Sequence, residues 1–180
     1  MPLTAYVMPL AGAAVLLGAW SILVEPRWLR VRRVELAAED VGLPPLRILH
    51  LTDLHFHGRD ATKLRFLRRL ATEDEYDLVL FTGDLIHSPA GLPALREAAG
   101  LFRPRLGSFG VLGGHDHLRA GALATYWNLL TPGRPGRFCR PNPADEVEKA
   151  LQDAGVKVLC DENRIVRDAG PLALIGLSDA

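Results

Sequence analysis

Aspartate and histidine side chains recur in three short segments of the sequence, and each segment directly follows an apolar run. Asp53 and His55 stand two residues apart in the first segment, Asp84 ends the second, and His115 and Asp116 belong to the third. Carboxylate oxygens together with imidazole nitrogens suit Zn²⁺, Mn²⁺ or iron. Divalent metals lower the pKa of a bound water and polarise phosphoryl oxygens. The three segments therefore predict a divalent-metal site.

The first pair, Asp53 and His55, also has a simpler interpretation. Residues two apart project to the same side of an extended chain, so these side chains would converge on one ion. An Asp-x-His pair is common, however, and an Asp at such a place often caps the following helix. Recurrence after three consecutive apolar runs favours the metal site. Glycines before Asp84 and His115 support it, because glycine lets the backbone approach an ion or phosphate closely.

The elements that would position these residues alternate along the chain. Short apolar runs at residues 46–52, 78–82 and 108–112 predict strands, and stretches at 61–72 and 93–101 predict helices between them. This order is typical of an α/β fold with a parallel sheet. Because ligands bind at the carboxyl ends of strands in open α/β sheets, we expect all three segments at one edge of the sheet.

The remaining elements are less regular. Residues 131–143 are rich in Pro, Gly and Arg and predict a surface loop, residues 144–153 predict a helix, and residues 156–159 and 172–175 predict strands. In the helix at 61–72, an apolar stripe is expected to pack on the sheet. The basic side chains of the opposite face are expected to be solvated: Lys63, Arg65, Arg68 and Arg69.

The N-terminal segment differs in character from the rest. Residues 5–24 carry no charged side chain and are long enough for one transmembrane helix. Residues 25–45 form a basic juxtamembrane linker. Because Lys- and Arg-rich flanks stay in the cytoplasm, we expect a single-pass membrane protein with a cytoplasmic C-terminal domain. A cleaved signal peptide is the alternative, but no basic residue precedes the apolar run.

Charge and cysteine content narrow the possible partners. The sequence has 21 Lys and Arg against 21 Asp and Glu, which argues against nucleic acid as a partner, since such binding needs clustered positive charge. The basic linker is expected to contact lipid headgroups. Cys139 and Cys160 lie far apart and fit reduced thiols better than a disulfide framework.

Together the three segments resemble the first three motifs of the calcineurin-like metallophosphoesterases, in order and in spacing. Within that family the sequence is similar to a bacterial membrane-associated branch, which includes phosphodiesterases and UDP-diacylglucosamine pyrophosphatase-like members. The resemblance implies two divalent metal ions (Mn, Fe or Zn) and a phosphoester substrate, and the anchor favours a lipid-linked one. It implies that Asp53 and His55 bind the first metal and that Asp84 bridges both. His115 would act as acid or transition-state donor, oriented by Asp116.

The chain departs from the family pattern at two places. Gly114 stands where the family has an Asn ligand, which puts the second metal site in doubt, and His87 or His117 is a candidate substitute ligand or second-shell residue. No histidine follows His117, although the family has two further histidine motifs. The resemblance therefore implies the N-terminal part of an α/β/β/α sandwich, a truncated domain over residues 46–180. A sheet face and strand left uncovered in this way are expected to self-associate.

Three hypotheses follow for the function. The first is a metal-dependent hydrolase of phosphodiester or pyrophosphate bonds at the membrane. The second is a non-catalytic membrane protein that binds metal or a partner, which the glycine at position 114 favours. The third is a gene fragment without a function of its own.

Overall fold

The computed structural model describes residues 8–9, 12–13, 16–20, 29–37, 42, 44–58, 60–121, 139–166 and 172–177. The chain divides into two compact units, Met1–Glu35 and Leu36–Ala180. Within the described residues, no helix is both long and apolar enough to cross a bilayer. Much of the predicted transmembrane segment, residues 5–24, lies outside the described ranges.

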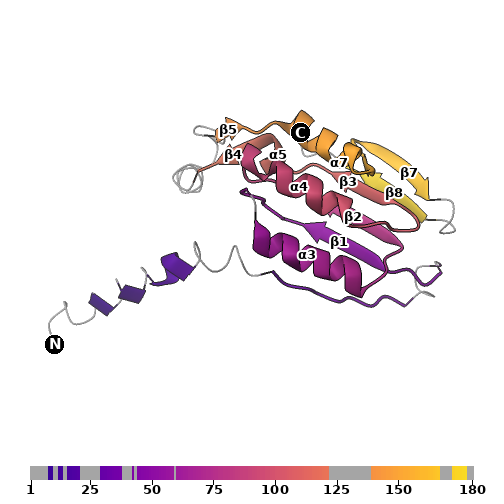
Figure 1. Ribbon diagram of the computed structural model, residues 1–180, viewed down its shortest axis with the longest axis horizontal. Coiled ribbons are helices and arrows are strands. Elements are labelled where there is room, and N and C mark those ends of the chain that lie inside the picture. The colour runs from indigo at the N-terminus through magenta and orange to yellow at the C-terminus, as the bar shows by residue number, and fades with distance from the viewer. Residues whose placement is uncertain are drawn as a thin grey trace. The chain divides into compact units, whose positions relative to one another are not determined.

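A four-stranded parallel sheet forms the centre of the second unit (Figure 1). Its strands, in spatial order, are β1 (Ile48–Thr52), β2 (Leu78–Thr82), β3 (Ser108–Val111) and β6 (Val156–Val158). The register places Leu51 opposite Phe81, and Phe81 opposite Gly110. The predicted α/β fold with a parallel sheet is confirmed, because each apolar run forms a strand and each intervening stretch a helix.

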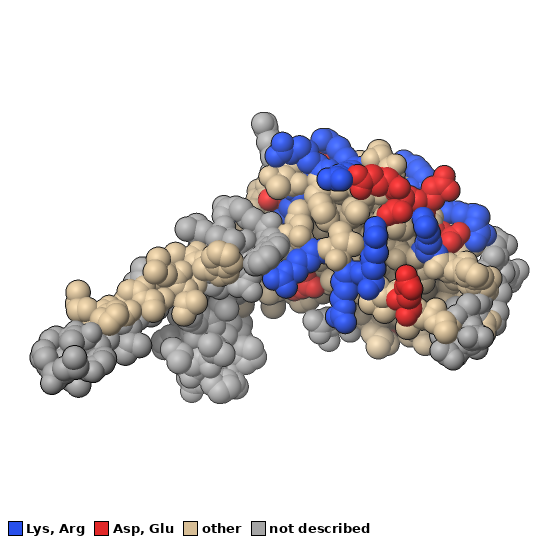
Figure 2. Space-filling view, turned by 90° about the horizontal axis from the view of Figure 1, so that it is seen from below, with Lys and Arg blue, Asp and Glu red and all other residues tan. Residues whose placement is uncertain are grey.

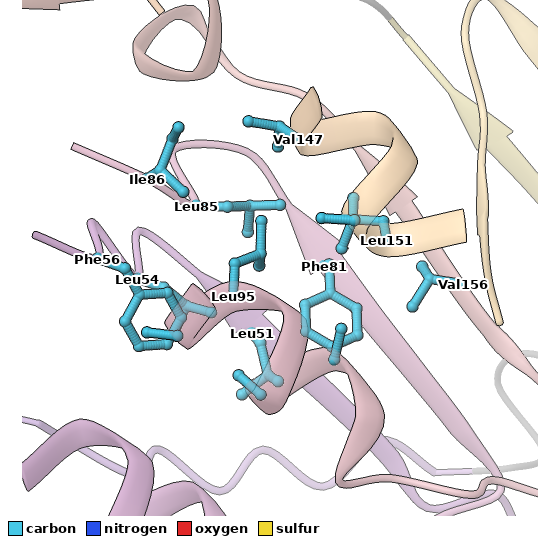
Figure 3. Close-up of a cluster of buried hydrophobic side chains, with 14 of the residues drawn as sticks. Leu51, Leu54, Phe56, Phe81, Leu85, Ile86, Leu95, Val147, Leu151 and Val156 are labelled. Atoms are coloured by element: carbon cyan, nitrogen blue, oxygen red, sulfur yellow. The ribbon is translucent and has the colours of Figure 1, made fainter. Parts of the chain in front are cut away.

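Three helices cover one face of this sheet: α3 (Ala61–Glu73), α4 (Leu92–Gly100), which follows the short helix η2 (Pro89–Gly91), and α7 (Ala144–Asp153). Alternate residues of β2 point to this side, and Phe81 packs with Leu95 of α4 and Leu151 of α7 (Figure 3). All three side chains are fully buried. Burial of such a side chain stabilises a fold by about 1.5–3 kcal/mol. The core therefore fixes the three strands that lead to the polar segments.

The opposite face is partly covered by an antiparallel hairpin of β7 (Glu162–Val166) and β8 (Leu172–Gly176). A second apolar cluster joins hairpin and sheet: Leu78, Phe109, Val166, Leu172 and Leu174. The strand at residues 172–175 was expected to be uncovered. This expectation is wrong for Leu172 and Leu174, whose side chains pack against the sheet. The expectation is met by Ile175 of this strand, which is 73% exposed. On the sheet itself, Ile48 of β1 is 47% exposed.

Two elements differ from the sequence-based expectation. The segment 131–143, expected to be a loop, contains β5 (Cys139–Pro141), which pairs antiparallel with β4 (Leu118–Ala120). β7 reads Glu-Asn-Arg-Ile-Val, three polar residues followed by two apolar ones, so no alternating pattern in the sequence predicted its pairing with β8. On the surface drawn in Figure 2, Lys and Arg side chains alternate with Asp and Glu side chains.

Asp77 connects the beginnings of β1 and β2 to the segment that leads into β3. Its carboxylate accepts a hydrogen bond from the backbone N–H of Arg47 (2.9 Å) and two from the guanidinium of Arg105 (3.1 and 3.0 Å). Its carbonyl accepts from the N–H of Leu106 (2.8 Å). The backbone hydrogen bond from Arg47 is the main reason why the pKa of Asp77 lies below its ordinary value.

Replacing Asp77 by Asn is expected to lower the free energy of unfolding by about 1 kcal/mol at pH 7, a value kept small because the carboxylate is partly solvated. The folded-state pKa lies below the unfolded value of about 3.9, so this stabilisation is present above that pH and is lost as the pH falls through the folded pKa. Urea unfolding of both proteins between pH 7 and pH 2.5 measures the effect. The difference should shrink below about pH 4.

Asp74→Asn is the matched control, because Asp74 meets the same Arg47 only through an exposed 3.4 Å ion pair. It should change the unfolding free energy by less than about 0.5 kcal/mol. An Asp77→Asn effect that stays constant over the whole pH range would contradict the proposed role of the carboxylate.

Candidate metal centre

The polar loops after β1, β2 and β3 are fixed to one another by backbone hydrogen bonds that continue the sheet past its strand ends. The N–H of Asp53 donates to the carbonyl of Gly83 (3.3 Å), and the N–H of His55 donates to that of Asp84 (2.9 Å). The N–H of Gly83 in turn donates to the carbonyl of Val111 (3.0 Å). The three loops therefore lie side by side at the carboxyl edge of the sheet.

The backbone at the three central residues is left-handed. The φ angles are 53° at Asp53, 42° at His55 and 53° at Asp84. The expectation that the backbone stays extended through Asp53 and His55 is therefore wrong, and their side chains converge through tight turns that directly follow β1. A non-glycine residue in such a conformation costs about 1–3 kcal/mol, and residues of this kind cluster at ligand sites.

Asp53, His55 and Asp84 form a group with the spacing of metal ligands. Their ligand atoms all lie within 4.8 Å of one another, and Nε2 of His55 lies 3.9 Å from Oδ1 of Asp53 and 3.7 Å from Oδ2 of Asp84. Two ligand atoms on one ion, each at about 2.0–2.2 Å, are separated by at most about 4.4 Å. Both His55–carboxylate separations fall within this limit and exceed a hydrogen bond. The three side chains could therefore hold one divalent ion.

The protonation state of His55 also suits metal binding. Burial lowers the pKa of its imidazole below the ordinary value, the neighbouring His115 lowers it further, and Asp84 and Asp53 oppose this. The neutral imidazole, which metal ions bind, is therefore favoured at neutral pH. Nδ1 of the ring is buried and has no hydrogen-bond partner within the described part of the chain.

His115 lies directly beside this group. Its backbone N–H donates to Oδ1 of Asp84 (3.0 Å), and its Nδ1 lies 3.2 Å from Oδ2 of the same carboxylate. The ring centroids of His55 and His115 are 4.9 Å apart. Because the His115 side chain stays 42% exposed, it can meet a ligand that arrives from solvent. Imidazole at such a place can donate a proton or hydrogen bond to an oxygen of the ligand.

Asp116 is fully buried and holds two loops together. Its Oδ1 accepts hydrogen bonds from the N–H groups of Leu85 (2.8 Å) and Ile86 (3.0 Å), and its Oδ2 accepts from the N–H of Gly113 (3.0 Å). Burial raises the pKa of this carboxyl, and the three N–H donors act against that rise. The family resemblance implied that Asp116 orients His115. The hydrogen bonds observed for Asp116 run to backbone instead, whereas Asp84 contacts the His115 ring.

Lys63 is a site residue that the sequence analysis missed. Its position on the basic side of α3 predicted a solvated side chain, but it is only 9% exposed. Its Nζ donates to the carbonyls of Leu54 (2.7 Å) and His55 (3.0 Å), and it lies 5.7 Å from the ring centre of Phe56. Through Lys63, α3 therefore holds the loop that carries Asp53 and His55. The expected solvation of this side of the helix is found for Arg65, Arg68 and Arg69, which are exposed.

The candidate substitute ligands lie at different distances from the centre. The ring of His87 lies 6.4 Å from the rings of both His55 and His115, and it stacks on His57 at 4.1 Å. Within the described residues, no ring contact joins His117 to these histidines. His87 is thus the better placed of the two candidates. Its pKa is lowered, mainly by burial.

Asn142 was also missed, because it belongs to the segment expected to be a surface loop. It is buried, its Nδ2 donates to the carbonyl of His115 (2.7 Å), and its backbone N–H donates to the carbonyl of His117 (2.8 Å). Its Oδ1 is buried without a hydrogen-bond partner among the described residues. No pattern in the sequence distinguishes this Asn from one in an exposed turn.

Replacing Lys63 by Met is expected to weaken Mn²⁺ binding about 10-fold or more, because the carbonyls of Leu54 and His55 lose their donor and the loop of Asp53 and His55 is released. Titration calorimetry with Mn²⁺ measures the affinity, and thermal unfolding measures stability. Arg65→Met, on the exposed side of the same helix, serves as the control and should change neither quantity. Unaltered Mn²⁺ affinity in the Lys63 variant would show that the helix does not position the loop.

Comparison with known proteins agrees with this arrangement. Residues 46–174, more than half of the chain, match the family model of the calcineurin-like phosphoesterases. The chain is also 31% identical over 120 residues to UDP-2,3-diacylglucosamine pyrophosphatase LpxG of Chlamydia trachomatis serovar D, a stretch that covers 64% of this chain and 36% of that protein. The chain thus spans about a third of the length of this relative. By its sequence match and its strand-end Asp and His residues, the chain belongs to the calcineurin-like phosphoesterase family.

Proposed function

We propose that this chain is a metal-dependent hydrolase of phosphoester bonds. The convergence of Asp53, His55 and Asp84 carries the proposal, because these side chains meet with ligand spacing at the edge of the sheet. His115 beside Asp84 adds a group that can act on a substrate. The family match supports the same class of reaction.

Each side chain of the site has a separate role in the proposed reaction. Asp53, His55 and Asp84 would hold a divalent metal, which when bound would polarise phosphoryl oxygens and lower the pKa of a water ligand. Asp84 fixes His115 through the backbone N–H and faces its ring. His115 donates a hydrogen bond or proton to the leaving oxygen of the substrate. Asp116 holds the loops of Asp84 and His115 together, because its carboxylate accepts hydrogen bonds from backbone N–H groups of both loops.

The proposal includes a second divalent ion, which has fewer protein ligands than the first. Asp84 would bridge the two ions, and Gly114 supplies no side chain to the second. Within the described part of the chain, one group of three or more His, Cys, Asp or Glu has ligand spacing. His87, with its ring 6.4 Å from that of His115, is the candidate to complete the second site.

The substrate we propose contains a pyrophosphate or phosphodiester bond and is linked to lipid. The relative from Chlamydia is named for a pyrophosphatase reaction on a diacylated sugar nucleotide, and it supports this class. An anchor at residues 5–24 would hold the site near such a lipid. Three of its described apolar side chains, Met8, Leu16 and Leu17, are at least 70% exposed, which is costly in water and favourable in a bilayer.

A non-catalytic metal-binding protein is the second candidate. The glycine at position 114 favours it, because a single ion with three protein ligands gives a weaker clamp on the phosphoryl group than two ions. The two candidates predict the same metal binding and differ only in turnover.

Asp84→Asn is the variant that separates the proposals. Asn tolerates the left-handed backbone and can still accept from the N–H of His115, so the fold should persist while the charge is lost. We expect Mn²⁺-dependent hydrolysis of bis(p-nitrophenyl) phosphate to fall about 100-fold or more, and bound Mn²⁺ to fall with it. Asp153→Asn, at the exposed end of α7, is the control and should match the wild type.

The outcomes of that experiment are distinct. Turnover by the wild type that Asp84→Asn abolishes supports the hydrolase. Bound Mn²⁺ without turnover in the wild type supports the metal-binding candidate. Equal background rates in both proteins, with no bound metal in either, would exclude both proposals.

The proposed membrane topology has its own test. A reporter fused after Ala180 should be active in the cytoplasm, because the arginines at 27–33 keep the C-terminal side of the proposed anchor in the cytoplasm. The fusion protein should remain in the membrane fraction. Deleting residues 5–24 should release the fusion from the membrane fraction. A reporter signal from the opposite side of the membrane would reverse the proposed orientation.

A further inference from the structure

The ribbon formed by β4 and β5 carries two arginines in direct register. Arg119 of β4 is the cross-strand partner of Arg140 of β5, and directly opposite residues place their side chains on one face of a ribbon. Like charges at such positions destabilise the pairing. Among the residues that the structure describes, no Asp or Glu lies within ion-pair distance of either guanidinium. The ribbon thus holds two uncompensated positive charges together.

Both strands of this ribbon connect to the metal centre, at the end where Leu118 pairs with Pro141. β4 directly follows the short helix α5 (Gly114–His117), which contains His115 (Figure 1). Asn142 directly follows β5, and it hydrogen-bonds the carbonyls of His115 and His117. Arg119 also lies close enough to His87 for its charge to act on that imidazole. The two arginines are therefore placed beside the centre and not on a remote surface.

We propose that Arg119 and Arg140 form an anion subsite that binds the second phosphate of a pyrophosphate-containing substrate, while the first phosphate lies at the metal centre. Guanidinium groups bind phosphate oxygens through paired hydrogen bonds, and an anion between the two arginines removes their repulsion. A simple phosphodiester offers no group to this subsite. The inference rests on the proposed hydrolase function and narrows its substrates to pyrophosphate diesters.

The first test measures binding alone. Metal-free full chain is titrated with inorganic pyrophosphate and, separately, with inorganic phosphate, for the wild type and for Arg119→Gln/Arg140→Gln. We expect the double variant to raise the Kd for pyrophosphate about 10-fold or more. Arg164→Gln, an exposed arginine on the other ribbon, should leave this Kd unchanged. Equal pyrophosphate affinities in wild type and double variant, or no preference of the wild type for pyrophosphate over phosphate, would overturn the proposal.

The second test measures specificity with metal present. We expect the double variant to lower kcat/KM for UDP-glucose, a pyrophosphate diester, about 10-fold more than for bis(p-nitrophenyl) phosphate, mainly through KM. The single variant Arg140→Gln, at an exposed position, gives the same comparison if the double variant unfolds. Equal losses on both substrates would contradict the subsite. Arginine-dependent pyrophosphate binding without hydrolysis of either substrate would support the subsite and refute the hydrolase function.

Discussion

The close approach of the loops after β2 and β3 is the constraint on which the metal centre depends. A Cβ atom at Gly113 would lie 2.5 Å from Oδ1 of Asp84 and 2.6 Å from its backbone nitrogen, so a residue with a side chain would force the loops apart. A Cβ atom at Gly83, whose φ is 68°, would lie 3.0 Å from the α-carbon of Gly113. This contact brings the N–H of His115 within 3.0 Å of Asp84. Separation of the two loops would disconnect the proposed proton donor from the proposed metal ligand.

Buried polar groups behind the loops offset the strain that this arrangement stores. Three left-handed residues are costly, and such conformations persist only where the surrounding structure determines them. Lys63 holds the first loop through two carbonyls, and Asp116 holds the second and third through three N–H groups. Both are charged groups in a buried position, where hydrogen bonds to charge are worth more than neutral ones. The candidate metal ligands and the residues that position them are therefore different sets.

Sequence patterns predicted the sheet and the convergence of Asp53, His55 and Asp84 because both depend on local signals. Apolar runs predict strands, and polar residues that follow parallel strands must meet at one edge. The left-handed turns at Asp53 and His55 were not predictable, because they arise from hydrogen bonds to the neighbouring loop. Lys63 and Asn142 were missed for a related reason: each looks like a surface residue in its own segment, and only tertiary contacts bury it. The strands β4 and β5 have only three residues each, which is too short for an alternating pattern to predict them.

The central claim is that Asp53, His55 and Asp84 bind one divalent ion together. Anomalous diffraction from crystals of the full chain grown with Mn²⁺ tests it most directly. We expect an anomalous peak at about 2.2 Å from one atom of each of the three side chains, with His115 beside Asp84. A peak that contacts none of these side chains, or no peak at saturating Mn²⁺, would contradict the account.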